Sequence, residues 1–276
     1  MSSPAPPPAP RTPAPGNRLL AGLPPDERAA LAPHLEPVVL EARQLTYDVD
    51  APITHVYFPE GAVVSVLGVL ADGTAVETAT IGVEGFVGLP VFLGTDRTAA
   101  QAFAQVPGPA QRMTADAFRA ALPDLPALSG ALGRYTQALF TLVAQSSACN
   151  RRHDVARRCA RWLLLTADRA GRDEFPLTHQ FLSQMLGVRR ATVTVAMGAL
   201  QAAGAVAYEM GRVRLLDRAR LAAAACECYA VVRREFDRLL GPPPSGAPAP
   251  PDPLARTATR DGDRSALGDG APGGER

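Results

Sequence analysis

The sequence of 276 residues contains no lysine, so all 28 of its basic residues are arginines. It has only four cysteines, four histidines and one tryptophan. No run of about 18 uninterrupted apolar residues occurs, which argues against a membrane-spanning helix. The N-terminus has no basic region followed by an apolar run, so we expect no signal peptide and a cytoplasmic protein with no membrane partner.

Motifs of the common enzyme classes are missing as well. The sequence has no nucleophile elbow, no HExxH, no P-loop and no GxGxxG ahead of a predicted helix. We therefore expect no catalytic residues, and a protein that is not an enzyme.

The cysteines all lie in the second half of the chain: Cys149, Cys159, Cys226 and Cys228. Their spacing gives no CxxC pair and no matched Cys/His quartet, and no early cluster could hold an iron–sulfur centre. The last two fall in an Ala-rich stretch that we expect to be helical, where small buried thiols are the simpler interpretation. The spacing therefore predicts no metal site.

The four histidines are scattered: His34, His55, His153 and His179. No two of them are four residues apart, and no carboxylate stands at ligand spacing. Haem ligation by one of them stays open as an alternative, so the cofactor is unknown from the sequence.

The net charge of +1 hides an asymmetry along the chain. Residues 17–125 carry 6 arginines against 13 acidic residues, whereas residues 126–240 carry 17 against 9. A basic half beside an acidic half points to nucleic acid as the partner of the second half. The flanks 1–16 and 241–276 hold 7 and 8 prolines, and we expect both to be disordered tails.

Residues 17–125 predict a small antiparallel β-structure after short N-terminal helices over residues 17–35. Asp72–Gly73 predicts a hairpin with a type I′ turn, which needs positive φ at both central positions. Short strands at this spacing are typical of a barrel or roll. The expected strands are Val56–Phe58, Ala62–Leu70, Ala75–Ile81, Phe86–Val87 and Ala99–Val106.

Residues 126–152 predict one long helix with a single apolar stripe. We interpret the stripe as a dimer seam packed like a coiled coil, and the alternative is that it packs on its own barrel. The stripe consists of Leu128, Leu132, Tyr135, Leu139, Leu142 and Val143. A second helix is expected from Asp154 to about Ala170, closed by Gly171.

Residues 153–220 predict a winged helix-turn-helix, and residues 221–240 a C-terminal helix. Thr178 is a suitable N-cap for a short helix, and Gly187 supplies the turn. A second helix begins near Arg190 and ends at Gly204. Two short strands around Met210–Gly211 complete the wing.

Charge placement indicates how this motif would bind double-stranded DNA. Arg189 and Arg190 occupy the first turn of the second helix, the end that enters the major groove, where arginine can bind guanine with two hydrogen bonds. Thr192 and Thr194 can bond phosphates or bases, Val195 can touch a thymine methyl, and His179 is a further candidate for a phosphate contact. On the wing, Arg212 and Arg214 suit phosphates.

This order of elements resembles the Crp/Fnr family of bacterial transcription regulators over about residues 17–217. The resemblance implies an α+β fold: an N-terminal antiparallel β-roll like a cyclic-nucleotide-binding domain, a long dimerisation helix and a C-terminal winged helix-turn-helix. It also implies a homodimer that binds palindromic DNA and contacts RNA polymerase. Thr178, Gln180 and Thr192 would contact the backbone, Arg190 would read a base, and Arg212 matches the basic wing position.

The same resemblance places a candidate effector site in the β-roll at Gly88, Arg97 and Thr98. Leu89 stands where the family's ribose-binding Glu belongs, and Val143 and Ala144 replace the residues that face adenine in the cyclic-AMP receptor protein. Missing buried hydrogen bonds argue against cyclic AMP. An anionic ligand at Arg97 and a structural arginine held by barrel carbonyls or Asp96 both stay open.

We therefore expect a sequence-specific DNA-binding regulator that responds to an effector through its β-roll. The alternative is a DNA-binding regulator whose barrel is a platform for another protein, with no small-molecule effector. Binding of a ligand to the barrel separates the two hypotheses.

Overall fold

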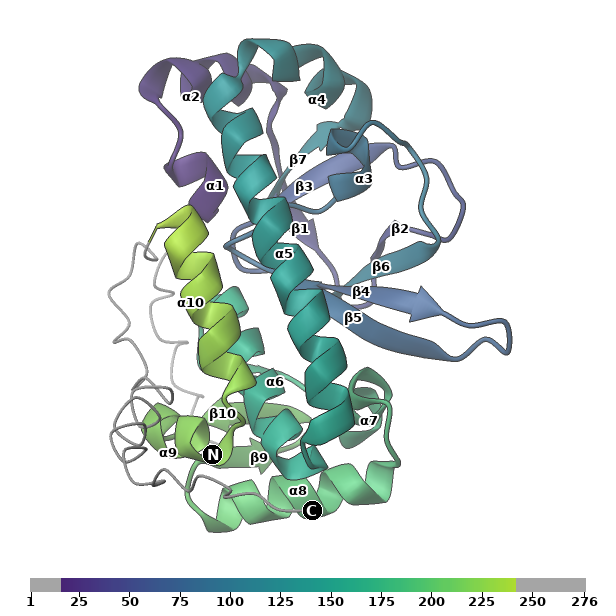
Figure 1. Ribbon diagram of the computed structural model, residues 1–276, viewed down its shortest axis with the longest axis vertical. Helices are drawn as coiled ribbons and strands as arrows, with labels where there is room; N and C mark the ends of the chain where they lie inside the picture. The colour runs from purple at the N-terminus through teal and green to yellow at the C-terminus, as the bar shows by residue number, and fades with distance from the viewer. Residues whose placement is uncertain (1–15, 242–276) are drawn as a thin grey trace, which may run out of the picture.

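The computed structural model describes residues 16–241, so the predicted tails fall almost wholly outside the described residues. The described chain forms an N-terminal β-roll, one long helix and a C-terminal winged helix-turn-helix, which confirms the expected α+β class (Figure 1). Within the described chain, no helix is long and apolar enough to cross a membrane.

Short helices precede the roll, as expected from residues 17–35. Asn17 caps the first of them by accepting hydrogen bonds from the backbone of Leu19 and Leu20. These helices are α1 (Arg18–Ala21), α2 (Pro25–Leu31) and the 3₁₀ turn η1 (Ala32–His34).

Two antiparallel sheets make the roll, with strand orders β1-β7-β3 and β2-β6-β4-β5. Their apolar faces meet in a core that includes Phe58, Phe86 and Phe118, all fully buried. The strands are β1 (Glu36–Leu40), β2 (Leu45–Tyr47), β3 (His55–Pro59), β4 (Val63–Val69), β5 (Ala75–Ile81), β6 (Ala100–Val106) and β7 (Gly108–Thr114).

The roll corrects two details of the predicted strands. Phe86–Val87 is not a strand, because Val87 makes only an isolated bridge to Tyr57 before the short helix α3 (Leu89–Phe92). The β4–β5 hairpin is present, but its turn is not type I′: Gly73 has a φ of +80°, whereas Asp72 has none of the positive φ values. The carboxylate of Asp72 instead accepts a hydrogen bond from the backbone of Thr74, which fixes a longer loop.

After the roll, α4 (Ala115–Ala121) and the 3₁₀ turn η2 (Leu122–Asp124) lead into α5 (Pro126–Arg152), which runs the length of the molecule in Figure 1. Most of the predicted apolar stripe is covered within its own chain, and only Val143, at 40%, is exposed. Leu128, Leu132, Tyr135 and Leu142 are buried within their own chain, and Leu139 is half-buried. The roll covers part of the stripe, and the C-terminal helix α10 (Cys228–Leu240) packs along the rest (Figure 1).

The expected C-terminal helix over residues 221–240 is in fact two helices. The first, α9 (Arg218–Ala224), packs on α6 (Val155–Ala170), and the second, α10, turns back along α5. Cys226 and Glu227 lie in the connection between them, so the Ala-rich stretch does not continue as one helix. The remaining elements are β8 (Glu174–Pro176), α7 (His179–Leu186), α8 (Arg190–Ala202), β9 (Val206–Glu209) and β10 (Arg212–Leu215).

Candidate DNA-binding surface

The helix-turn-helix forms where the sequence predicts it, because each end carries its own local signal. The hydroxyl of Thr178 caps α7 by accepting a hydrogen bond from the Phe181 amide at 3.1 Å. Gly187 adopts the left-handed conformation, with φ +63°, and ends that helix. Arg189 is the N-cap of α8, which buries Val193 and Met197 against the rest of the domain.

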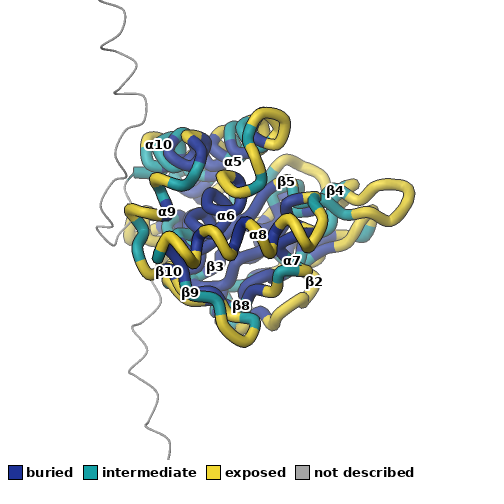
Figure 2. Tube along the Cα trace, turned by 90° about the horizontal axis from the view of Figure 1, so that it is seen from below, coloured by how far each residue is buried: buried dark blue, intermediate teal, exposed yellow. Residues whose placement is uncertain are grey.

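Arg189 and Arg190 lie at the exposed start of α8, at the end of the molecule that Figure 2 views from below. Neither guanidinium forms an ion pair with another described residue. Other arginines of the domain differ in this respect, since Arg218 and Arg220 are paired with aspartates. The two arginines at the start of α8 are therefore available to an external anion.

The exposed face of α8 beyond its first turn is uncharged and built of small side chains. Thr192 is exposed, and Val195 is 74% exposed. Thr194 is engaged within the chain: its hydroxyl donates to the Arg190 carbonyl at 3.1 Å and lies 3.0 Å from Nδ1 of His179. Of the two predicted threonines, Thr192 is thus the one left open to DNA.

His179 occupies a structural position. Its ring stacks on Tyr208 of β9 with centroids 4.4 Å apart, and burial together with the nearby Arg190 lowers the pKa of His179. The imidazole therefore favours its neutral form beside Thr194. This contact network joins α7, α8 and the wing, and does not point His179 to a phosphate.

The wing is a three-stranded sheet with order β8-β10-β9, of which β8 is an addition to the two expected strands. Met210 and Gly211 both have positive φ, +46° and +74°, so the β9–β10 hairpin has the primed turn that suits strand twist. Arg212 pairs with Glu174 at 2.8 Å, whereas Arg214 is exposed and forms no ion pair with the described residues. Gln180 is exposed on the first turn of α7.

The candidate effector residues in the roll are satisfied by their own chain. The guanidinium of Arg97 donates to the Asp50 carbonyl, lies 4.0 Å from Asp96 and is 55% exposed. Thr98 accepts a hydrogen bond from the Ala100 amide at 3.3 Å. These contacts match the alternative of a structural arginine.

Gly88 is likewise explained by the backbone. It caps α3 with a φ of +106°, and a Cβ there would lie 2.7 Å from Cγ1 of Val56. A glycine is therefore required whether or not a ligand binds nearby.

A second feature, not anticipated from the sequence, is the tight contact between the roll and the DNA-binding domain. Glu84 and Arg169 form a buried ion pair at 2.9 Å, with side chains 11% and 4% exposed. The Val83 amide donates to the Arg169 carbonyl at 3.1 Å. A Cβ on Gly82 would collide with the Arg169 backbone, so this close approach needs glycine.

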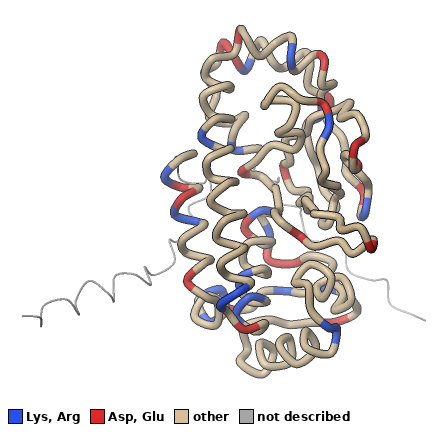
Figure 3. Tube along the Cα trace, turned by 45° about the vertical axis from the view of Figure 1, so that its right-hand side comes forward, with Lys and Arg blue, Asp and Glu red and all other residues tan. Residues whose placement is uncertain are grey.

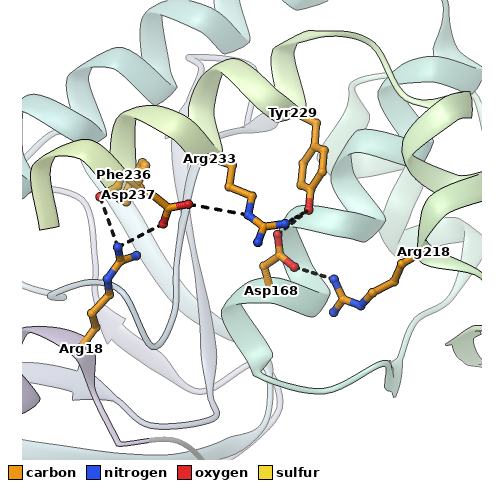
Figure 4. Close-up of polar contacts among 7 residues, drawn as sticks. All are labelled: Arg18, Asp168, Arg218, Tyr229, Arg233, Phe236 and Asp237. Carbon is orange, nitrogen blue, oxygen red and sulfur yellow. Dashed lines mark hydrogen bonds and ion pairs between the residues drawn. The ribbon is translucent and has the colours of Figure 1, made fainter. Parts of the chain in front are cut away.

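Beside this contact lies a cavity of about 240 Å³, bounded by α1, α6, α9, α10 and the loop after β5. Figure 4 shows a chain of polar contacts along it: Arg18 to Asp237 at 3.1 Å, Tyr229 to Asp168 at 2.8 Å and Arg218 to Asp168 at 2.6 Å, with Arg233 between the two groups. This chain connects the N-terminal helix of the roll through α10 to the winged helix-turn-helix.

Farther along the same interface, the carboxyl group of the half-buried Glu77 joins β5 to α6. Ser65 donates to Oε2 of Glu77 at 2.8 Å, and the indole N–H of Trp162 donates to Oε1 at 2.8 Å. Burial raises the pKa of Glu77 to about 7, despite hydrogen bonds and the charges of Arg169 and Arg161, which act in the other direction.

We expect this carboxyl group to make stability depend on pH. The folded pKa of Glu77 lies above its ordinary value of 4.5, so its contribution is complete below pH 4.5 and is lost as the pH rises through 7. Because the residue is partly exposed, we expect a loss of up to about 2 kcal/mol over that range. Glu77→Gln should remove this slope and be the more stable form at pH 8. Urea unfolding of both proteins from pH 5 to 8 checks this, and equal slopes would contradict it.

The structure brings together four potential metal ligands that the linear spacing does not suggest. Cys149, His153, Cys226 and Cys228 converge, with one ligand atom from each lying within 4.8 Å of the others. The fold thus assembles the Cys/His quartet that linear spacing appeared to exclude, because α10 returns to the end of α5. Two signals in the sequence point to it: Cys149 and His153 are four residues apart on a helix, and Cys226 and Cys228 flank a single residue.

Comparison with known proteins agrees with this architecture. The family model of the Crp-like helix-turn-helix domain matches residues 157–224. A search of curated proteins finds no match.

Among solved structures, a Crp/Fnr family transcriptional regulator from Eubacterium rectale superposes with a TM-score of 0.56 at 15% identity, covering 75% of this chain and 96% of its own. FixK2 from Bradyrhizobium japonicum gives 0.54 at 18%, covering 70% and 98%, and the c-di-GMP-responsive regulator CLP of Xanthomonas campestris gives 0.55 at 17%, covering 69% and 98%.

Residues 157–224 are a Crp-like helix-turn-helix domain. The superpositions show that the part of the chain they cover has the fold of Crp/Fnr family regulators. The resemblance expected from Thr178, Arg190 and the β-roll is confirmed at this level.

Proposed function

We propose that this chain is a transcription regulator of the Crp/Fnr type that binds a two-fold symmetric DNA site as a homodimer, with Arg190 of α8 reading a base in each half-site. The observation that carries this proposal is the exposed pair Arg189 and Arg190 at the start of α8, with no ion-pair partner among the described residues. An unpaired guanidinium at a helix N-terminus that faces solvent keeps its donors free for guanine O6 and N7.

The remaining candidates divide by role. Thr178, Gln180, Thr192 and Arg214 are exposed and suit phosphates, which add affinity without sequence information. Arg212 would have to exchange Glu174 for a phosphate, so we expect a smaller contribution from it. Thr194 acts through its contact with His179, and Val195 is placed to touch a thymine methyl.

Arg190→Ala should weaken binding to the preferred site by about 1–3 kcal/mol per half-site, while random DNA is affected far less. The preferred site is first selected from a random duplex pool, where we expect half-sites about 34–36 Å apart. Fluorescence anisotropy with selected and scrambled duplexes at fixed salt then gives both affinities. Arg238→Ala on α10, an exposed arginine paired with Glu235, is the matched control. Unchanged preference in Arg190→Ala would refute the assignment of this residue.

We also propose that signals reach α8 through the interface between the roll and the winged helix-turn-helix. The Asp50 carbonyl and Asp96 already contact Arg97, which argues against an anionic effector at that position. For that part of the β-roll, these contacts favour the alternative in which the roll binds another protein. The cavity beside Glu84 and Arg169 offers an effector another place, between the parts that would have to move. From the family resemblance we also propose that the protein acts by binding and not by catalysis, and that it contacts RNA polymerase.

A further inference from the structure

Four potential metal ligands meet where the long helix ends and the DNA-binding domain begins. Cys149 lies in the last turn of α5 and His153 is the C-cap of that helix, whereas Cys226 lies in the α9–α10 connection and Cys228 is the first residue of α10. The three thiols are buried, and the imidazole is 14% exposed. No part of the DNA-binding proposal uses these side chains.

The distances suit a single ion with four ligands. A tetrahedral zinc site has Zn–S bonds of about 2.3 Å, so its ligand atoms stand about 3.8 Å apart. Here Sγ of Cys149 lies 3.5 Å from Sγ of Cys226, and Sγ of Cys228 lies 3.5 Å from Nδ1 of His153. The widest separation among the four atoms is within 4.8 Å. Small shifts of side chains would therefore complete the tetrahedron.

The surroundings prepare these groups to bind a cation. The other ring nitrogen of His153, Nε2, lies 3.1 Å from the carboxylate of Glu227, which holds Nδ1 toward the thiols. Such a carboxylate–histidine pair is the usual support of a metal-bound imidazole. The amide of Gln145 donates to Sγ of Cys228 at 3.1 Å and would stabilise a thiolate there.

Two buried arginines near the quartet also bear on its charge. Arg158 and Arg161 are 8% and 6% exposed, and neither has a carboxylate within ion-pair distance among the described residues. In each guanidinium Nε is buried without a hydrogen-bond partner. Both charges act on Cys149. Three thiolates with one divalent cation carry a net charge of −1, which these buried cations would offset.

We propose that Cys149, His153, Cys226 and Cys228 form a tetrahedral Cys₃His site for one thiophilic divalent cation, Zn²⁺ in particular. Soft thiolate ligands with one imidazole in this geometry select zinc over magnesium or calcium. A polynuclear iron–sulfur centre fits less well, because it spaces its cysteine sulfurs farther apart than the ligands of a single ion.

The location gives the site a structural role. Asp154, the N-cap of α6, directly follows His153, so the ion would sit at the junction of the long helix and the DNA-binding domain. It would also hold α10 against α5 and anchor the end of α9. Bound metal would thus fix the angle at which α8 is presented.

The test uses full-length protein, stripped of metal by a chelator under reducing, oxygen-free conditions and titrated with Co²⁺. Tetrahedral cobalt–thiolate coordination gives intense visible absorption, which we expect to saturate at one ion per chain and to vanish when Zn²⁺ is added. Cys228→Ser should abolish the thiolate spectrum. Glu227→Gln should weaken Zn²⁺ binding by about 10–100-fold, because it removes the support of His153.

Cys159→Ala is the matched control, since Cys159 is equally buried but lies beside Met197, outside the quartet. It should bind Co²⁺ as the parent protein does. His153→Gln changes the most accessible ligand, so it serves as a second test if Cys228→Ser fails to fold. Circular dichroism should show that this variant is folded, and its visible cobalt absorption should differ from that of the parent protein. Folded parent protein without a thiolate–cobalt spectrum, or an unchanged spectrum in His153→Gln, would overturn the proposal.

Discussion

Glu84→Ala is expected to lower the free energy of unfolding by about 3–5 kcal/mol, because it leaves the buried charge of Arg169 without its partner. Other contacts of the Arg169 guanidinium would not replace the lost ion pair. Its Nη1 atom is already buried without a hydrogen-bond partner, and the residue is 4% exposed. The lost partner also supports the Gly82 amide, which donates to the same carboxylate at 3.3 Å.

A double substitution tests whether the unpaired charge causes the loss of stability. Replacing both partners, as in Glu84→Leu with Arg169→Leu, removes the charge along with its partner, and should recover most of the lost stability. Urea unfolding can be followed by the fluorescence of Trp162, the one tryptophan of the chain, which lies in the same interface. Far-UV circular dichroism reports the whole molecule, so a difference between the two curves reveals separation of the domains before global unfolding. A loss below about 1 kcal/mol in Glu84→Ala would mean that the pair is solvated.

The helix-turn-helix could be predicted from the sequence because its signals are local. Thr178 and Gly187 determine the two ends of α7 through contacts within a few residues. The basic half of the chain is predictable for the same reason, since charge is counted along the sequence. Figure 3 shows basic segments over the whole molecule, several of them in the lower part where this domain lies.

Contacts between distant segments could not be predicted in this way. Glu84 and Arg169 are 85 residues apart, and Cys149 and Cys226 are 77 apart. The sequence around each of these residues does not indicate its partner. The pairs form only because α10 returns to α5 and α6 packs on the roll. Strands β1, β2 and β7 were also not predicted. The first two are short and largely exposed, and all three are fixed by pairing with distant strands: β1 with β7, β2 with β6, and β7 with β3.

The long helix shows why periodicity alone does not locate a dimer seam. Periodicity identifies residues that share a face of a helix, but it does not say what covers that face. The most apolar face of α5 is covered by α10 and the roll. A second face remains exposed and uncharged, and its positions alternate by four and three residues: Gly133, Gln137, Phe140, Ala144 and Ser147. That spacing is typical of a coiled-coil seam.

Phe140→Asp is therefore expected to convert the dimer to a monomer. Phe140 is 71% exposed at the middle of this face, and aromatic residues at the centre of an interface commonly contribute at least about 2 kcal/mol each. Loss from both subunits would weaken self-association about 1,000-fold, and the paired carboxylates would add repulsion. Sedimentation velocity over a concentration series measures the change.

Leu142→Asp separates this seam from the one first predicted. Leu142 is 3% exposed within its own chain, so a carboxylate there should unfold the protein rather than divide a folded dimer. Phe140→Leu, which keeps an apolar side chain, should remain dimeric. If Phe140→Asp stays dimeric, the seam lies elsewhere on the molecule. If it is a folded monomer, binding to the palindrome should fall far more than binding to an isolated half-site, because two linked reading helices gain affinity only while the subunits are held together.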